Sequence, residues 1–86
     1  MDVYNIVVTA DAQRDIAKLD VVTRKRLQKK LQFFVDSGQP LSFATQLINT
    51  RPPMYRFRIG KYRVFFDIKD KTLRILAVER RDQAYR

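Results

Sequence analysis

One stretch decides the fold: Tyr55-Arg56-Phe57-Arg58-Ile59-Gly60-Lys61-Tyr62-Arg63-Val64-Phe65-Phe66. Apolar and basic side chains alternate before Gly60-Lys61, and the apolar alternation resumes after it, with the period of two that is typical of strands. Glycine in the first position of a two-residue loop suits a tight hairpin turn. The stretch therefore predicts a β-hairpin with arms at Met54–Ile59 and Tyr62–Ile68.

The two-residue turn fixes which residues of the hairpin face each other. Counting outward from it places Arg58 opposite Arg63, and it places Arg56 opposite Phe65. Alternation sends one set of side chains to an apolar face beneath the helices: Tyr55, Phe57, Ile59, Tyr62, Val64, Phe66 and Ile68. The three arginines share the other face. Because like charges directly opposite in a sheet are destabilising, we expect an anion to bind between Arg58 and Arg63.

A third strand is expected at Thr72–Arg80, after a turn at Asp70-Lys71. The same count places Asp67 opposite Arg74, which makes an ordinary cross-strand ion pair away from the arginine cluster. This pair is therefore expected to stabilise the sheet without taking part in binding.

Continuing the count places Phe65 opposite Leu76, and Arg63 opposite Val78. Phe65, Leu76 and Val78 are then expected to form a small apolar floor beside the arginines. Such a floor suits a stacked base, with Phe65 as the stacking residue. It suits a protein partner equally well, because exposed apolar patches also mark protein interfaces.

The first half of the chain predicts a strand at Tyr4–Val8 and two helices. Thr9 is a suitable N-cap for a helix over residues 10–19, and Asp20 is suitable for a longer one ending at Asp36. The apolar residues at helical spacing are Ala12, Ile16, Leu19, Leu27, Leu31, Phe34 and Val35. Gly38 and Pro40 end the second helix, and a short strand is expected at Ala44–Ile48. The expected fold class is α+β: an N-terminal strand and an αα-hairpin packed on a twisted antiparallel β-sheet, with residues 1–86 as a single domain.

Composition restricts the chemistry. The chain has 86 residues, a formal net charge of +9, no cysteine and no histidine. It therefore has no disulfide, no thiolate or imidazole ligand, and none of the commonest acid–base catalyst. Residues 51–86 carry eleven basic and four acidic side chains, against seven and five in residues 1–50. This excess in the second half suits a polyanion such as nucleic acid. We expect no signal peptide, no membrane segment, no metal and no cofactor, and a cytoplasmic protein.

The hairpin, a hydrophobic strand and the ending Val78-Glu79-Arg80-Arg81-Asp82-Gln83-Ala84-Tyr85 together resemble the RelE/ParE superfamily of type II toxin–antitoxin toxins. The resemblance covers essentially the whole chain. The RelE branch is favoured because both the basic hairpin and the terminal Arg…Tyr pair are present. That branch cleaves messenger RNA, commonly in the A site of the 30S ribosomal subunit. The resemblance further implies a cognate antitoxin that blocks the toxin in a hetero-oligomeric complex.

By motif position, the resemblance implies functional roles for Arg56, Arg58, Arg63, Arg81 and Tyr85. We expect Arg63, Arg81 and Tyr85 to be catalytic, and Arg56, Arg58, Lys61 and Arg80 to bind RNA phosphates. Many relatives carry histidine where Arg80 stands, and lysine where Arg56 and Arg58 stand. These departures leave the phosphate-binding role intact, but they do not identify the general base. Tyr85 is expected to act either as that base or as a group that positions the nucleotide.

The residues themselves indicate an electrostatic mechanism. In the expected reaction the ribose 2′-OH attacks the adjacent phosphate, and arginine donors stabilise the charge of the transition state. Two alternatives remain open. One is a ParE-like toxin that inhibits DNA gyrase, and the other is a basic RNA-binding module without enzymatic activity.

Overall fold

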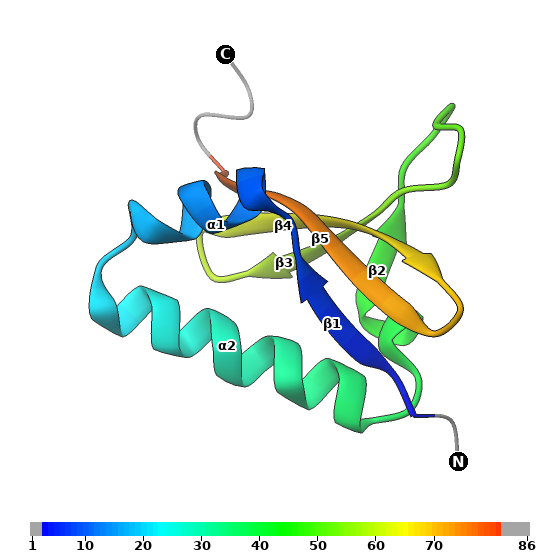
Figure 1. Cartoon of the computed structure of the whole chain (residues 1–86), viewed down its shortest axis with the longest axis horizontal. Coiled ribbons are helices and arrows are strands. Elements are labelled where there is room, and N and C mark those ends of the chain that lie inside the picture. Colours follow the sequence, from blue (N-terminus) through cyan, green and yellow to red (C-terminus); the bar gives the residue numbers. More distant parts are fainter. Residues whose placement is uncertain (1–2, 82–86) are drawn as a thin grey trace.

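The elements follow the expected order from strand to helices to hairpins (Figure 1). The computed structural model describes residues 3–81. Its elements are β1 (Asn5–Val8), α1 (Ala10–Ala17), α2 (Val21–Asp36), the 3₁₀ turn η1 (Pro40–Phe43), β2 (Ala44–Gln46), β3 (Tyr55–Ile59), β4 (Tyr62–Lys69) and β5 (Thr72–Arg80). No helix of this described part is long and apolar enough to cross a membrane.

The five strands form one sheet in the order β1-β5-β4-β3-β2. Strands β2 to β5 pair antiparallel, as expected. Strand β1 joins the edge beside β5 in parallel, so the complete sheet is mixed. The α+β class, with an N-terminal strand and an αα-hairpin packed on a sheet, is confirmed.

Side-chain caps fix where the two helices begin. Thr9 Oγ1 accepts a hydrogen bond from the backbone N–H of Ala12 at 3.2 Å, which caps α1. Asp20 Oδ1 accepts one from the N–H of Thr23 at 2.7 Å, which caps α2. Both caps are as predicted, whereas α1 ends two residues earlier than expected, at Ala17. Each cap satisfies a backbone donor that a helix start leaves without an intrahelical partner.

The core lies between the helices and one face of the sheet. Its buried members are Ala12, Leu27, Leu31, Phe34, Val35, Phe57, Ile59, Val64, Phe66, Leu73, Ile75 and Val78. Tyr55, Tyr62 and Ile68 pack against this cluster, so the predicted apolar face of the hairpin is confirmed. Phe57 and Phe66 stack with ring centroids 4.3 Å apart at its centre.

Both predicted hairpin turns are present. Gly60 has a φ of +57° in the β3–β4 turn, which favours glycine because a Cβ is strained there. Asp70 and Lys71 have φ values of +52° and +61° in the β4–β5 turn. Two successive positive φ angles give the strand twist that a two-residue hairpin requires. The β3–β4 register is also as predicted, with Arg58 opposite Arg63.

An extra residue in β5 overturns part of the predicted β4–β5 register. Phe66 pairs with Ile75, and Phe65 pairs with Ala77, so a bulge accommodates Leu76 between them. The predicted pairings of Phe65 with Leu76 and of Arg63 with Val78 are therefore wrong. Val78 lies opposite Val64 and is only 8% exposed, in the core. Glu79 takes its place opposite Arg63.

Candidate functional site

The three hairpin arginines occupy the face of the sheet that points away from the helices. Arg56 and Arg58 lie on β3 and Arg63 on β4, at positions that alternate with buried residues such as Phe57 and Val64. Because successive strand residues point to opposite faces, the burial of these neighbours places the arginines outward. We call the surface formed by Arg56, Arg58 and Arg63 the arginine face.

The three side chains of the arginine face differ in exposure. Arg58 is exposed and Arg56 is half-buried, whereas Arg63 is only 7% exposed. Arg63 lies on the central strand, between Arg58 on one side and Glu79 on the other. A guanidinium held in this way has little conformational freedom to lose when it binds an anion. In this arrangement Arg63 can act as a fixed hydrogen-bond donor, and Arg58 beside it can act as a more mobile one.

Glu79 brings a carboxylate into the row that crosses the arginine face. The bulge at Leu76 shifts the outward positions of β5 by one residue, which aligns Glu79 with Arg63. An opposite charge directly across a strand pair is stabilising. Glu79 therefore offsets part of the repulsion between Arg58 and Arg63, and the row Arg58–Arg63–Glu79 keeps a net positive charge.

The predicted apolar floor exists in altered form. Phe65 lies between Arg56 on β3 and Ala77 on β5, and all three are half-buried. Phe65, Leu76 and Ala77 lie outside the buried core cluster. Val78 does not belong to the floor, because the bulge turns it inward. The base-stacking candidate Phe65 thus remains next to Arg56, with Ala77 in the place assigned to Leu76.

The turn end of the β4–β5 hairpin has a different electrostatic character. Arg74 donates two hydrogen bonds to the carboxylate of Asp67, from Nε at 3.0 Å and from Nη2 at 2.5 Å. The hydrogen bond from Arg74 lowers the pKa of Asp67, and the carboxylate raises the pKa of Arg74. The predicted ion pair between Asp67 and Arg74 is confirmed, and each of the two side chains balances the charge of the other.

The remaining site residues lie around the end of the β3–β4 hairpin. Arg80 pairs with Tyr62 and so belongs to the helix side of the sheet, away from the arginine face. The backbone N–H of Arg81 donates to the carbonyl of Lys61 at 2.6 Å, which holds the end of β5 beside the hairpin turn. Tyr85 lies outside the described residues.

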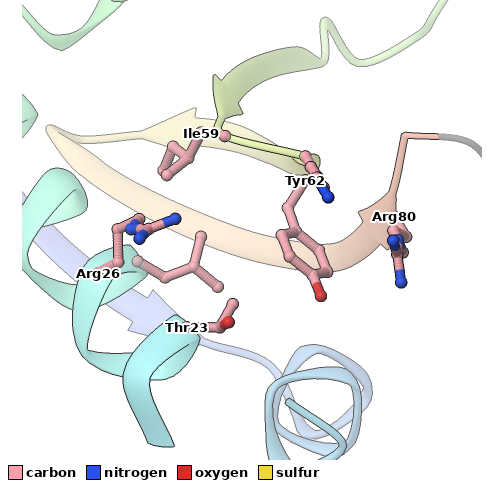
Figure 2. A pocket seen from close by; sticks show the side chains of 8 residues that line it. Thr23, Arg26, Ile59, Tyr62 and Arg80 are labelled. Atoms are coloured by element: carbon pink, nitrogen blue, oxygen red, sulfur yellow. The ribbon is translucent and has the colours of Figure 1, made fainter. Parts of the chain in front are cut away.

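A cleft of about 440 Å³ opens on the helix side of this hairpin end, between α2 and the strands (Figure 2). It is lined by Thr23, Arg26, Leu27, Ile59, Gly60, Lys61, Tyr62 and Arg80. The sequence analysis missed Arg26 as a site residue. Its position next to Leu27 could have indicated it, because a residue beside a buried position of an amphipathic helix lies at the border of the face that packs on the sheet.

Comparison with known families gives a match over nearly the whole chain. Residues 6–85 match the family described as the ParE toxin of the type II toxin–antitoxin system, parDE. No curated protein sequence gives a significant match.

Solved structures with a similar fold come from toxin–antitoxin systems. The chain is similar to a chain of the archaeal RelE–RelB complex from Pyrococcus horikoshii OT3, with a TM-score of 0.73 and 23% identity over 91% of this chain and 94% of that one. It is also similar to the RelBE2 toxin–antitoxin complex from Mycobacterium tuberculosis, with a TM-score of 0.68 and 29% identity over 91% and 98%. It is similar as well to the intact RelBE toxin–antitoxin complex of E. coli, with a TM-score of 0.71 and 22% identity over 90% of this chain and 95% of that one.

Proposed function

The chain belongs to the ParE toxin family of type II toxin–antitoxin systems, and we propose that it acts as an endoribonuclease that cleaves messenger RNA and so inhibits translation. The proposal extends to a cognate antitoxin that binds and neutralises the toxin. Its support is that the similar solved structures are described as toxin–antitoxin complexes. The proposed setting is the cytoplasm, where messenger RNA and ribosomes are found.

One observation carries the ribonuclease proposal: Arg58 and Arg63 face each other across β3 and β4 on the outer face of the sheet. Two guanidinium groups in this position repel each other unless an anion lies between them. Their forked N–H donors match the oxygens of a phosphate, and they stay charged at any physiological pH. A phosphodiester between them would gain hydrogen bonds and relieve the repulsion.

The proposed reaction is attack of the ribose 2′-OH on the adjacent phosphate. The new bond joins the 2′-oxygen to phosphorus, the bond to the 5′-oxygen breaks, and the products are a 2′,3′-cyclic phosphate and a 5′-hydroxyl. Arg63 and Arg81 stabilise the added negative charge of the transition state, and Arg56, Arg58 and Lys61 hold the flanking backbone. Tyr85 acts as the general base or positions the ribose. Arginine does not accept the proton, because a guanidinium group stays protonated at physiological pH.

A site of this composition has few proton-transfer groups, because the chain has no histidine. We therefore propose that the ribosomal A site supplies the geometry of the substrate, by holding the reacting ribose and phosphate in line. Phe65, beside Arg56, is the proposed stacking surface for a neighbouring base.

The test is inducible expression of the chain, followed by mapping of messenger RNA 5′ ends with and without ongoing translation. New 5′ ends within translated messages are expected within minutes of induction, and they should be lost when translation initiation is blocked. Intact messages in growth-arrested cells would refute the ribonuclease proposal.

The second candidate function is inhibition of DNA gyrase. It is favoured by the match to a family described as ParE, and by Glu79, whose carboxylate lies in the row of Arg58 and Arg63 and reduces its positive charge. Gyrase inhibition predicts DNA breaks trapped with gyrase and intact messenger RNA. The same induction experiment therefore separates the two functions when chromosomal breaks are measured in parallel.

A further inference from the structure

The cleft on the helix side of the hairpin end is a second basic site, separate from the arginine face. Strand alternation places Arg80 on the side of Tyr62, whereas Arg63 points to the opposite side. Figure 2 shows Arg26 and Thr23 extending from α2, Tyr62 extending from β4 toward the helices, and Arg80 at the end of β5. Lys61, in the turn, completes the basic rim of the cleft.

Arg26 is held close to the β3–β4 turn. A Cβ added to Gly60 would lie 3.8 Å from Nη1 of Arg26, so the guanidinium lies beside the turn. The positive φ of Gly60, +57°, favours glycine at this position of the turn. The cation from α2 and the turn of the hairpin are thereby brought together at one cleft.

The cleft has a strongly positive lining. Arg26, Lys61 and Arg80 contribute three positive charges, and the described side chains that line the cleft include no carboxylate. Two acids on neighbouring elements have other roles: Asp20 caps α2 through the N–H of Thr23, and Asp15 accepts a hydrogen bond from the N–H of Val78 at 2.9 Å. The attraction for an anion therefore comes from side chains, because the start of α2 is already capped.

Size and chemistry favour a nucleotide over a smaller anion. About 440 Å³ is within the usual range for a small-molecule site. Leu27, Ile59 and the ring of Tyr62 offer apolar contacts, and Thr23 and Tyr62 offer hydroxyl groups. A phosphate monoester carries about −1.5 to −2 charges at neutral pH and so matches three cations better than a single carboxylate does.

We propose that this cleft binds a nucleoside monophosphate unit through its phosphate monoester, with Arg26 as the main phosphate contact. The unit comes either from the phosphorylated end of an RNA strand or from a free nucleotide. The inference does not depend on whether the arginine face cuts RNA, because Arg26 takes no part in the proposed cleavage.

The test is calorimetric titration of the full-length protein with adenosine 3′-monophosphate, adenosine 5′-monophosphate and adenosine at fixed ionic strength. At least one nucleotide is expected to bind with one-to-one stoichiometry, about tenfold or more tightly than adenosine. Arg26→Gln should weaken this binding about tenfold. Lys29→Gln, which removes the same charge from α2 outside the cleft lining, should change it by less than about twofold.

Three results would overturn the inference. The first is equal binding of adenosine and both nucleotides, and the second is equal loss of affinity in Arg26→Gln and Lys29→Gln. The third is stronger competition by an acidic peptide than by adenosine monophosphate, which would assign the cleft to a protein partner. If circular dichroism shows that Arg26→Gln does not fold, Arg80→Gln takes its place, with the same expected loss.

A second arm identifies the source of the phosphate. It uses 2′-O-methyl oligonucleotides, which lack the attacking 2′-OH, with and without a terminal phosphate. Tighter binding of the phosphorylated oligonucleotide than of adenosine monophosphate assigns the cleft to RNA ends. Equal binding of the two assigns it to free nucleotides. Because no oligonucleotide is cut, failure of the ribonuclease proposal would leave this result unchanged.

Discussion

The two ends of the outer sheet surface use charge in opposite ways. Near the β3–β4 turn, Arg58 faces Arg63 across neighbouring strands. Near the β4–β5 turn, Asp67 faces Arg74, and the two form a bidentate ion pair. Both pairs are cross-strand neighbours in the same sheet, yet one is repulsive and the other is attractive.

This difference separates the stabilising role of the Asp67–Arg74 pair from the proposed binding role of the Arg58–Arg63 pair. Asp67 and Arg74 already satisfy each other, so an added anion gains little from Arg74. We expect the Arg58–Arg63 pair to gain most when a phosphate reduces the repulsion between the two guanidinium groups. Glu79 reduces the difference between the two ends, because it lies opposite Arg63 on β5 and compensates part of the positive charge of the arginine face.

The largest expected effect comes from Arg63→Ala. Loss of a fixed donor to the transition state should reduce RNA cleavage by about 10²–10³-fold. Arg74→Ala, at the other end of the surface, should change cleavage by less than about twofold, since its guanidinium is occupied by Asp67. Cleavage in a translation extract measures both, and urea unfolding checks that both variants fold. A loss with Arg74→Ala and none with Arg63→Ala would reverse the assignment of the two ends.

Arg58→Glu should turn the repulsive pair into an attractive one. We expect the free energy of unfolding to rise by about 0.2–1 kcal/mol, because opposite charges then face each other across the strands. RNA affinity should fall at least about tenfold, since a carboxylate now points at the phosphate. Urea unfolding and a filter-binding assay measure the two quantities. Arg58→Gln serves as control, and a loss of both stability and binding in Arg58→Glu would contradict a trade-off at this position.

Glu79→Gln should increase the difference in charge between the two ends of the outer sheet surface. Removing the carboxylate beside Arg63 raises the positive charge of the arginine face, so RNA affinity should rise about twofold to fivefold at low salt. The gain should shrink as salt increases, because exposed charges are screened. Titration at two salt concentrations measures the effect, and an affinity that falls would mean that Glu79 positions Arg63 for binding.

The smallest expected effect is a pH dependence from the Asp67–Arg74 end. Because the hydrogen bond from Arg74 lowers the pKa of Asp67 in the folded protein, this pair stabilises the fold above the unfolded pKa of about 4. That stability is lost as the pH falls through the folded pKa. Arg74→Met should therefore lose less stability between pH 6 and pH 2 than the unsubstituted protein does. Asp20, whose pKa is lowered mainly by its hydrogen bond with Thr23, contributes equally to both proteins.

Much of the fold could be predicted because local signals were strong. Gly60 fixed one hairpin turn, and the count from it gave the opposition of Arg58 and Arg63. Thr9 and Asp20 were recognisable as helix caps, since each is followed by residues with helical periodicity. The parallel pairing of β1 with β5 had no such signal, because no local sequence feature selects a partner strand distant in the chain.

The bulge at Leu76 shows where counting failed. The run Ile75-Leu76-Ala77-Val78 is apolar throughout, so it hides the alternation that would reveal an extra residue. A signal existed in the polar residues: Arg74 and Glu79 are separated by an odd number of positions, and both can point outward only if the alternation slips once between them. The assignment of Arg80 to the helix side follows from the same slip.

The hydrogen bond from the N–H of Val78 to Asp15 has a consequence for assembly. Strand β1 pairs with β5 only as far as Ile75, so the last part of β5 is not covered by it. An uncovered strand edge is a template for pairing with another chain. By occupying one donor of this edge, the carboxylate from α1 discourages sheet-to-sheet growth at this position.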